Sequence, residues 1–233
     1  MKGTAITTHK THLTNILLEI YKDSDLSHAL GFKGGTAAML FYQLPRFSVD
    51  LDFDLIGDAD LVVKKLNKIL GAKYRIIDSS TKYHTLFWLL SYGAGLTHIK
   101  VEVSTRDNPF NHYEVKSLYG SELLVLKRPD MVAHKLVASL ERAHKASRDL
   151  FDIHYFLSNP DFAEINYDII TDRTGKKPKQ FYTELLKVVE KIDPTNILNG
   201  VGELLSESQK DWARAKLIDE LKIFIKRNRD LIH

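Results

Sequence analysis

The chain contains no cysteine. This absence excludes disulfide bonds, cysteine-ligated zinc, iron–sulfur clusters and thiol nucleophiles, so any metal ion must bind to Asp, Glu or His side chains. No run of about eighteen apolar residues occurs, and the chain begins with an amphipathic pattern instead of a signal peptide. We therefore expect a cytoplasmic protein without a membrane partner. The P-loop and the dinucleotide-binding fingerprint are also missing, which excludes the usual nucleotide-binding motifs.

Neither sign of charge dominates, because 33 Lys and Arg residues stand against 30 Asp and Glu residues, for a formal net charge of +3. No globally basic domain is therefore expected. With 233 residues, 44% of them hydrophobic, the chain can bury a real core as one large domain or two smaller ones.

The pattern of apolar residues changes near residue 127. Residues 1–127 predict an α/β domain on a mixed, mostly antiparallel sheet, and residues 128–233 predict a helical domain, which together make an α+β fold. Helices are expected over 9–21, 36–43, 59–70, 178–192, 195–206 and 208–230, and within 129–160. Strands are expected just before Gly34, within 46–55, and over 73–80, 83–93 and 97–104.

The stretch RFSVDLDFDL, residues 46–55, places Asp50, Asp52 and Asp54 at every second position. This period is typical of a half-buried strand whose polar residues share one face. Asp is unfavourable in strands and like charges on one face repel, so a cation, solvent or both must compensate. Asp50 and Asp52 would lie roughly 7 Å apart, close enough to bind one or two Mg²⁺ ions together. Asp54 would lie where the strand leaves this site, facing solvent or supporting the ligands.

The stretch KGGT, residues 33–36, lies between an expected strand and an expected helix. Its two glycines let the backbone approach a ligand closely, and the N–H groups at the start of the helix can bind an anion. Alone, a Gly-Gly pair is more often only a turn.

A third carboxylate is available in IKVEVS, where Glu102 alternates with Val101 and Val103. Each acidic strand taken separately can equally be an edge strand protected by charge. Two such strands after the Gly-Gly-Thr turn favour a metal site.

Charged residues at helical spacing occur in the second part of the chain. Lys135 and Arg142 are seven residues apart, on one face of a helix, and Arg148 and Asp152 are spaced i, i+4 on the next. The alternative is ordinary surface ion pairing, which contributes little to stability.

Gly-Gly-Thr followed thirteen residues later by Asp-Leu-Asp-Phe resembles the signature of the DNA polymerase β-like nucleotidyltransferases. A narrower resemblance is carried by FKGGTAAMLFYQLPRFSVDLDF, IKVEVS, AHKLVASLER and RDLFDIHYFL. In this order they are similar to the motifs of the AbiEii/AbiGii (MenT-like) toxin nucleotidyltransferases of bacterial toxin–antitoxin and phage-defence systems. The resemblance covers about residues 30–55, 99–104 and 129–157, and nothing beyond Ser158 is diagnostic.

The resemblance implies roles for individual residues. Asp50 and Asp52 would hold the metal ions, with Glu102 at a third position that is usually Asp in such proteins. Lys135 resembles the lysine that grips the nucleoside triphosphate, and Asp149 would be catalytic or would orient a lysine or arginine. The implied nucleotide-binding residues are Gly34, Gly35, Thr36, Arg46, Ser48, Lys135, Arg142, Arg148 and Asp152.

Arg46 and Ser48 match the Arg-x-Ser that precedes the aspartates in such proteins. Arg46 can bind a phosphate, but an arginine there can equally pair with Asp50 or Asp54. Thr36 replaces a common serine and keeps its hydroxyl.

The resemblance implies a nucleotidyltransferase with a two-metal Mg²⁺ site, for which Mn²⁺ is an alternative. It would transfer NMP from a nucleoside triphosphate to an acceptor hydroxyl, in a cleft between the two domains, and release pyrophosphate. The implied acceptor is RNA, foremost the tRNA 3′ end, and the implied role is that of a toxin with a cognate antitoxin. Two alternatives stay open: transfer to a small molecule or protein, and a non-catalytic binding module that keeps the fold.

Overall fold

The computed structural model describes residues 3–93, 96–142, 147–160 and 164–232. The chain divides into two compact units. Unit 1 consists of Met1–Gln43 and Phe47–Lys127, and unit 2 of Leu44–Arg46 and Arg128–His233. The segment 44–46 thus belongs to unit 2, although the residues on both sides of it belong to unit 1. None of the helices in the described ranges is long and apolar enough to cross a membrane.

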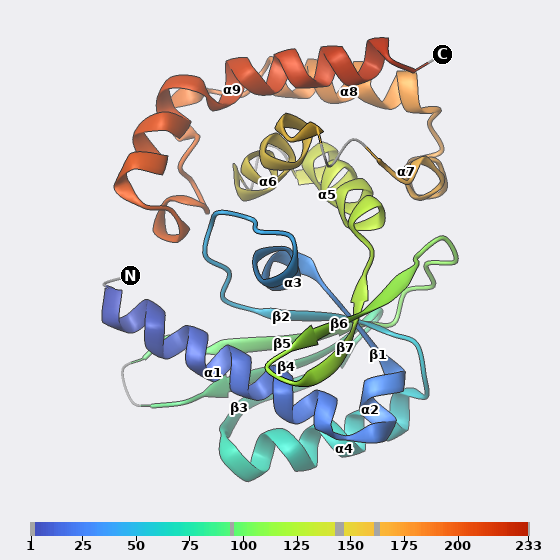
Figure 1. Ribbon diagram of the computed structural model, residues 1–233, viewed down its shortest axis with the longest axis vertical. Helices are drawn as coiled ribbons and strands as arrows, with labels where there is room; N and C mark the ends of the chain where they lie inside the picture. The colour runs from blue at the N-terminus through green and yellow to red at the C-terminus, as the bar shows by residue number, and fades with distance from the viewer. Residues whose placement is uncertain (1–2, 94–95, 143–146, 161–163, 233) are drawn as a thin grey trace. The chain divides into compact units, whose positions relative to one another are not determined.

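Unit 1 is built on a seven-stranded sheet in the order β3-β4-β5-β2-β1-β7-β6 (Figure 1). The strands are β1 (Leu30–Lys33), β2 (Leu51–Leu55), β3 (Arg75–Lys82), β4 (Thr85–Ser91), β5 (Ile99–Ser104), β6 (Tyr113–Leu118) and β7 (Ser121–Leu126). Only the pairs β1/β7 and β2/β5 are parallel, and the other neighbours are antiparallel. The expected mixed, mostly antiparallel sheet of an α+β fold is confirmed.

Helices cover both faces of this sheet. Figure 1 shows α1 (Gly3–Lys22), α2 (Ser24–Ala29) and α4 (Ala59–Lys73) on one face and α3 (Gly34–Phe41) on the other. Asp side chains begin two of these helices, since Asp23 accepts hydrogen bonds from the first turn of α2 and Asp58 accepts one from Leu61 in α4. Such caps satisfy backbone N–H groups that have no partner within the helix.

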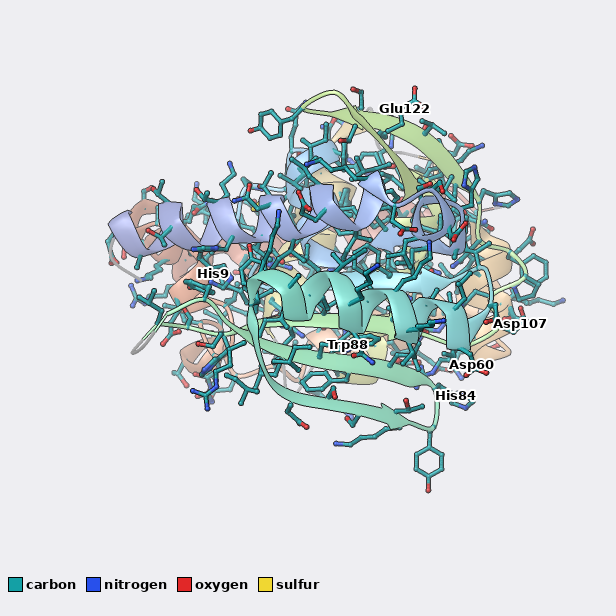
Figure 2. The ribbon with its side chains drawn as sticks, turned by 90° about the horizontal axis from the view of Figure 1, so that it is seen from below. His9, Asp60, His84, Trp88, Asp107 and Glu122 are labelled. Carbon is teal, nitrogen blue, oxygen red and sulfur yellow. The ribbon has the colours of Figure 1, made fainter. Side chains whose placement is uncertain are left out.

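Alternation along the strands produces one apolar and one polar face. On β5, Val101 and Val103 are completely buried, whereas Glu102 between them is not. Trp88 on β4 lies opposite Val101 and beneath α4 (Figure 2), where its Nε1 donates a 2.7 Å hydrogen bond to Asn67. Burying each such side chain contributes about 1.5–3 kcal/mol. The apolar face therefore packs against α4, and the charged residues of β2 and β5 are left on the face with α3.

Unit 2 is helical. Its helices are α5 (Arg128–Arg142), α6 (Ser147–Ser158), α7 (Tyr167–Thr174), α8 (Pro178–Val189) and α9 (Glu207–Asp230). The longest, α9, begins with a capping box in which Ser206 and Gln209 bond reciprocally to each other's backbone. The core of unit 2 contains Phe156, Phe181 and Tyr182, which are all fully buried.

Some expected elements differ from the structure. The helix expected over 195–206 is wrong: only the 3₁₀ turns η2 (Pro194–Asn196) and η3 (Gly202–Leu204) form there, and Gly200 between them has φ of 72°. A positive φ at glycine interrupts a right-handed helix. Four elements, α2, α7, β6 and β7, were not predicted from the sequence.

Candidate active site

Gly34 places the turn between β1 and α3 directly against a carboxylate. Its φ of +80° is in the left-handed region, and a Cβ atom added to it would lie 2.1 Å from Oδ2 of Asp52. No other residue type could take this place without displacing Asp52. Gly35 and Thr36 follow in the first turn of α3, where both are buried.

Replacing Gly34 by alanine should lower the free energy of unfolding by about 1–3 kcal/mol, because it combines backbone strain with overpacking. Gly71 is the matched control, since it lies in α4 and its added Cβ would meet only Ile76 at an ordinary 3.7 Å. Gly71→Ala should be neutral or slightly stabilising. Urea titrations of both variants measure the difference, and equal effects would show that the Gly34 turn is not strained against Asp52.

Asp50 lies immediately before β2, so the strand is shorter than the expected stretch 46–55. The backbone is fixed on both sides of the Asp50 Cα atom. Thr36 Oγ1 donates a 2.5 Å hydrogen bond to the carbonyl of Asp50, and His9 Nε2 lies 2.9 Å from the carbonyl of Val49. Lys100 supplies a cation near the Asp50 carboxylate, with its Nζ 4.0 Å from Oδ2 of Asp50.

His9 is completely buried on α1, and burial lowers its pKa. The ring is therefore neutral at pH 7. Because a carbonyl only accepts, Nε2 carries the proton toward Val49, and Nδ1 accepts from the Tyr92 hydroxyl at 2.8 Å. Figure 2 shows His9 on α1, far in sequence from the segment that it holds.

Asp52 and Glu102 are direct neighbours on parallel strands, since they are register partners of β2 and β5. Across the other edge of β2, Asp52 lies opposite Lys33 of β1. Glu102 thus lies next to Asp52, and its role as a third carboxylate of a metal site stays a prediction. Both side chains are half-buried.

Nucleotidyl transfer usually requires a divalent metal ion, which carboxylates of the site would have to bind. In the described ranges, no group of three or more His, Asp or Glu side chains is arranged to hold a metal ion. Mg²⁺, however, is usually bound by one or two carboxylates, with water and substrate phosphates completing its shell. Asp52 and Glu102 provide such a pair of oxygen donors on adjacent strands, so the donor set fits Mg²⁺ or Mn²⁺.

Asp54 does not face solvent, because only 3% of it is exposed. Its Oδ1 accepts a 2.5 Å hydrogen bond from Lys33 Nζ, and its Oδ2 accepts from the Tyr113 hydroxyl at 2.8 Å and Asn111 Nδ2 at 3.0 Å. The third aspartate of β2 is therefore part of a closed polar cluster.

In unit 2, one buried carboxylate binds two cations. Arg46 donates two hydrogen bonds to Asp152, from Nε to Oδ1 at 2.5 Å and from Nη2 to Oδ2 at 2.7 Å. Lys135 Nζ lies 2.6 Å from Oδ2 of the same carboxylate. Burial alone would raise the pKa of Asp152, but Lys135 and Arg46 outweigh it and hold the pKa below its ordinary value. Asp152 is therefore ionised and paired with both cations.

The other predicted residues of unit 2 lie on α5 and α6. Arg142 Nη2 is 3.1 Å from Oδ2 of Asp149, and this oxygen is buried without a hydrogen bond of good geometry. Arg148 is half-buried, and no ion pair between it and Asp152 occurs among the residues that the structure describes. The i, i+4 spacing of Arg148 and Asp152 therefore did not identify the partners of Asp152.

The structure thus gathers the predicted residues in two sets. In unit 1 it brings together Gly34, Gly35, Thr36, Asp50, Asp52 and Glu102, with Ser48 buried in the segment before β2. In unit 2 it brings together Arg46, Lys135 and Asp152, with the Arg142–Asp149 pair on the same two helices. Lys33 and His9 also contact the residues of this site, and neither was predicted from the sequence. Only the position of Lys33 beside Gly34 could have signalled its role, because the partner of His9 is 40 residues away.

The Gly-Gly-Thr turn opens a helix beside carboxylates on adjacent parallel strands, and the match to a family of nucleotidyl transferases shows that the chain is an enzyme of this class. Two solved structures share its fold. JHP933 from Helicobacter pylori is 19% identical with a TM-score of 0.59, over 99% of this chain and 94% of that chain. A candidate nucleotidyltransferase, also from H. pylori, is 21% identical with a TM-score of 0.58, over the whole of both chains.

The family is shown by sequence. The model of the nucleotidyl transferase AbiEii toxins of type IV toxin–antitoxin systems matches residues 15–219, so the chain belongs to the AbiEii family. A comparison with curated proteins finds no match. The resemblance inferred from the motifs is thereby confirmed. Family membership implies a nucleotide substrate and a cognate antitoxin.

Proposed function

We propose that this AbiEii-family enzyme transfers NMP from a nucleoside triphosphate to an RNA hydroxyl, foremost the tRNA 3′ end, with Mg²⁺ or Mn²⁺ bound by Asp50, Asp52 and Glu102. The observation that carries the proposal is the register of Asp52 and Glu102, whose carboxylates lie on adjacent strands with Gly34 packed against the first. Transfer to RNA by the toxin of a toxin–antitoxin system would block growth, and phage defence is the cellular role that we assign to it.

In the proposal, some residues of unit 1 bind the phosphates and others take part in the reaction. Backbone N–H groups of Gly34, Gly35 and Thr36 at the start of α3 would bind phosphate oxygens. When bound, the metal ion would neutralise negative charge on the phosphates and activate the acceptor hydroxyl. The acceptor hydroxyl would lose its proton to solvent, its oxygen would attack the α-phosphorus, the bond from the α-phosphorus to the β-phosphate oxygen would break, and pyrophosphate would leave.

The cluster of unit 2 would contribute positive charge. The side chain of Lys135 is 13% exposed, whereas that of Arg46 is bound bidentately to Asp152 and only 3% exposed. In the proposal, Lys135 therefore binds the triphosphate directly and Arg46 orients Asp152. Asp149 orients Arg142, to which it is paired, and Arg142 and Arg148 supply further positive charge.

The proposal is tested by incubating the protein with each labelled triphosphate, Mg²⁺ or Mn²⁺, and either total tRNA, total protein or no acceptor. Label should enter tRNA, should disappear in Glu102→Gln and should persist in Glu102→Asp, which restores the carboxylate at shorter reach. Glu122→Gln is the matched control, because Glu122 is exposed on β7 (Figure 2) and β1 lies between β7 and β2 in the sheet.

The other outcomes separate the alternatives. Label on protein or on a small molecule would identify a different acceptor for the same reaction. No label in any mixture, with all four triphosphates and both ions, would indicate a binding module without turnover and would overturn the proposal.

A further inference from the structure

Lys33 carries a cation on the polar face of the sheet, directly beside the Gly-Gly-Thr turn. It is the last residue of β1 and its register partner is Asp52, so its side chain starts on the same face as the Asp52 carboxylate. The ammonium does not extend straight across to Asp52. It binds Asp54 one step along β2, with Nζ 2.5 Å from Oδ1.

Asp54 is held rigidly enough to fix this ammonium. Tyr113 and Asn111 bind its Oδ2, and Gly31 provides room for the Tyr113 ring. A Cβ atom at Gly31 would lie 2.2 Å from Cε1 of that ring. Gly31 is also the register partner of Asp54. The absence of a side chain at Gly31 therefore allows Tyr113 to pack there and to fix the position of the Asp54 carboxylate, which binds Lys33.

The ammonium group of Lys33 has more N–H donors than its bond to Asp54 uses. An ammonium group carries three N–H donors, and among the residues that the structure describes Asp54 is the only acceptor for that of Lys33. The side chain is 23% exposed, against 4% for that of Asp54. A cation so placed can donate charge-assisted hydrogen bonds to a ligand on the polar face, and phosphate oxygens are strong acceptors of such bonds.

We propose that Lys33 binds the phosphates of the nucleoside triphosphate, or the pyrophosphate product, and that Asp54 is the positioning residue that holds its ammonium in place. The inference rests on the proposed function and adds to it a phosphate ligand and the residue behind it. In a purely structural alternative, the Lys33–Asp54 pair would stabilise the sheet and leave phosphate affinity unchanged.

Isothermal titration of the full chain with inorganic pyrophosphate, with and without Mg²⁺, distinguishes the two. Lys33→Met keeps the apolar stem and should weaken binding about tenfold to a hundredfold, the equivalent of one lost charge-assisted hydrogen bond. It should also raise KM for the triphosphate more than it lowers kcat. Lys68→Met is the matched control. Lys68 is exposed on α4, which packs on the apolar face of the sheet, and the variant should bind pyrophosphate with wild-type affinity. Wild-type affinity in Lys33→Met would overturn the proposal.

A double-mutant cycle tests whether Asp54 acts through Lys33. Asp54→Asn should weaken pyrophosphate binding in the wild-type background and have no further effect in the Lys33→Met background. An equal effect in both backgrounds would overturn the positioning role. Should Asp54→Asn fail to fold, Lys33→Met alone decides whether the lysine binds phosphate. A wild type that transfers no nucleotide would refute the proposed function, whereas unchanged affinity in Lys33→Met beside active wild type refutes only this inference.

Discussion

Asp52→Asn is expected to lower kcat for nucleotidyl transfer by at least about a hundredfold, while the protein remains folded. Asparagine has the size of aspartate and fits against Gly34, but it brings no negative charge opposite Glu102. In the proposed function Asp52 binds the metal ion, and loss of such a carboxylate would remove several kcal/mol of transition-state stabilisation, where each 1.4 kcal/mol is about tenfold in rate. Single-turnover transfer to the acceptor that the wild type labels measures the effect, and circular dichroism confirms the fold.

Two other Asp→Asn variants locate the site along the chain. Asp60 is exposed at the start of α4 (Figure 2), and Asp60→Asn should transfer at the wild-type rate. Asp54→Asn should be much milder in kcat than Asp52→Asn, because Asp54 acts through Lys33. Equal losses in Asp52→Asn and Asp54→Asn would show that the reacting centre lies one step further along β2.

Most of the polar face could be predicted from sequence because it depends on local periodicity. Alternation in β2 and β5 assigns Asp52 and Glu102 to one face, and the Gly-Gly pair predicts a turn before them. The burial of Asp54 could not be predicted in the same way. It depends on Tyr113 and Asn111, which approach only because β6 forms, and β6 was not predicted. Its sequence, YEVKSL, is short and polar and carries no strong strand signal.

The partner of Arg46 illustrates a second limit. The sequence left a phosphate, Asp50 and Asp54 as possible partners, and the structure shows Asp152, which is 106 residues away. Spacing along a helix predicts neighbours three or four residues apart, but it says nothing about a segment such as 44–46 that leaves one unit to pack in the other. Lys135 and Arg142 do share a face of α5, as their spacing predicts, and both pair with carboxylates of α6.

Asp152→Asn is expected to destabilise unit 2 strongly. The substitution keeps the shape of the side chain but leaves Arg46 and Lys135 close together, largely buried and without their carboxylate. Removing one partner from a buried ion pair costs about 3–5 kcal/mol, because the remaining charge is uncompensated. Because both cations depend on this carboxylate, Asp152 is expected to be necessary for the folding of unit 2.

The two tryptophans of the chain allow this loss to be assigned to one unit. Trp212 packs against Phe151 and His154 on α6, beside Asp152, whereas Trp88 lies in unit 1. In a Trp88→Phe background, urea unfolding followed by Trp212 fluorescence should show a much lower midpoint for Asp152→Asn. Asp219→Asn is the matched control, exposed on α9, and should leave the midpoint unchanged.

Acid should reproduce the effect of Asp152→Asn in the wild type. The pKa of Asp152 is lower in the folded than in the unfolded chain, so the unfolded state takes up the proton first as the pH falls. The contribution of Asp152 to stability is therefore complete above the ordinary pKa of aspartate, and it is lost as the pH falls below that value through the folded-state pKa. Wild type and Asp152→Asn should differ most near pH 7 and converge in acid. A constant difference across this range would show that Asp152 stabilises unit 2 by its shape and not by its charge.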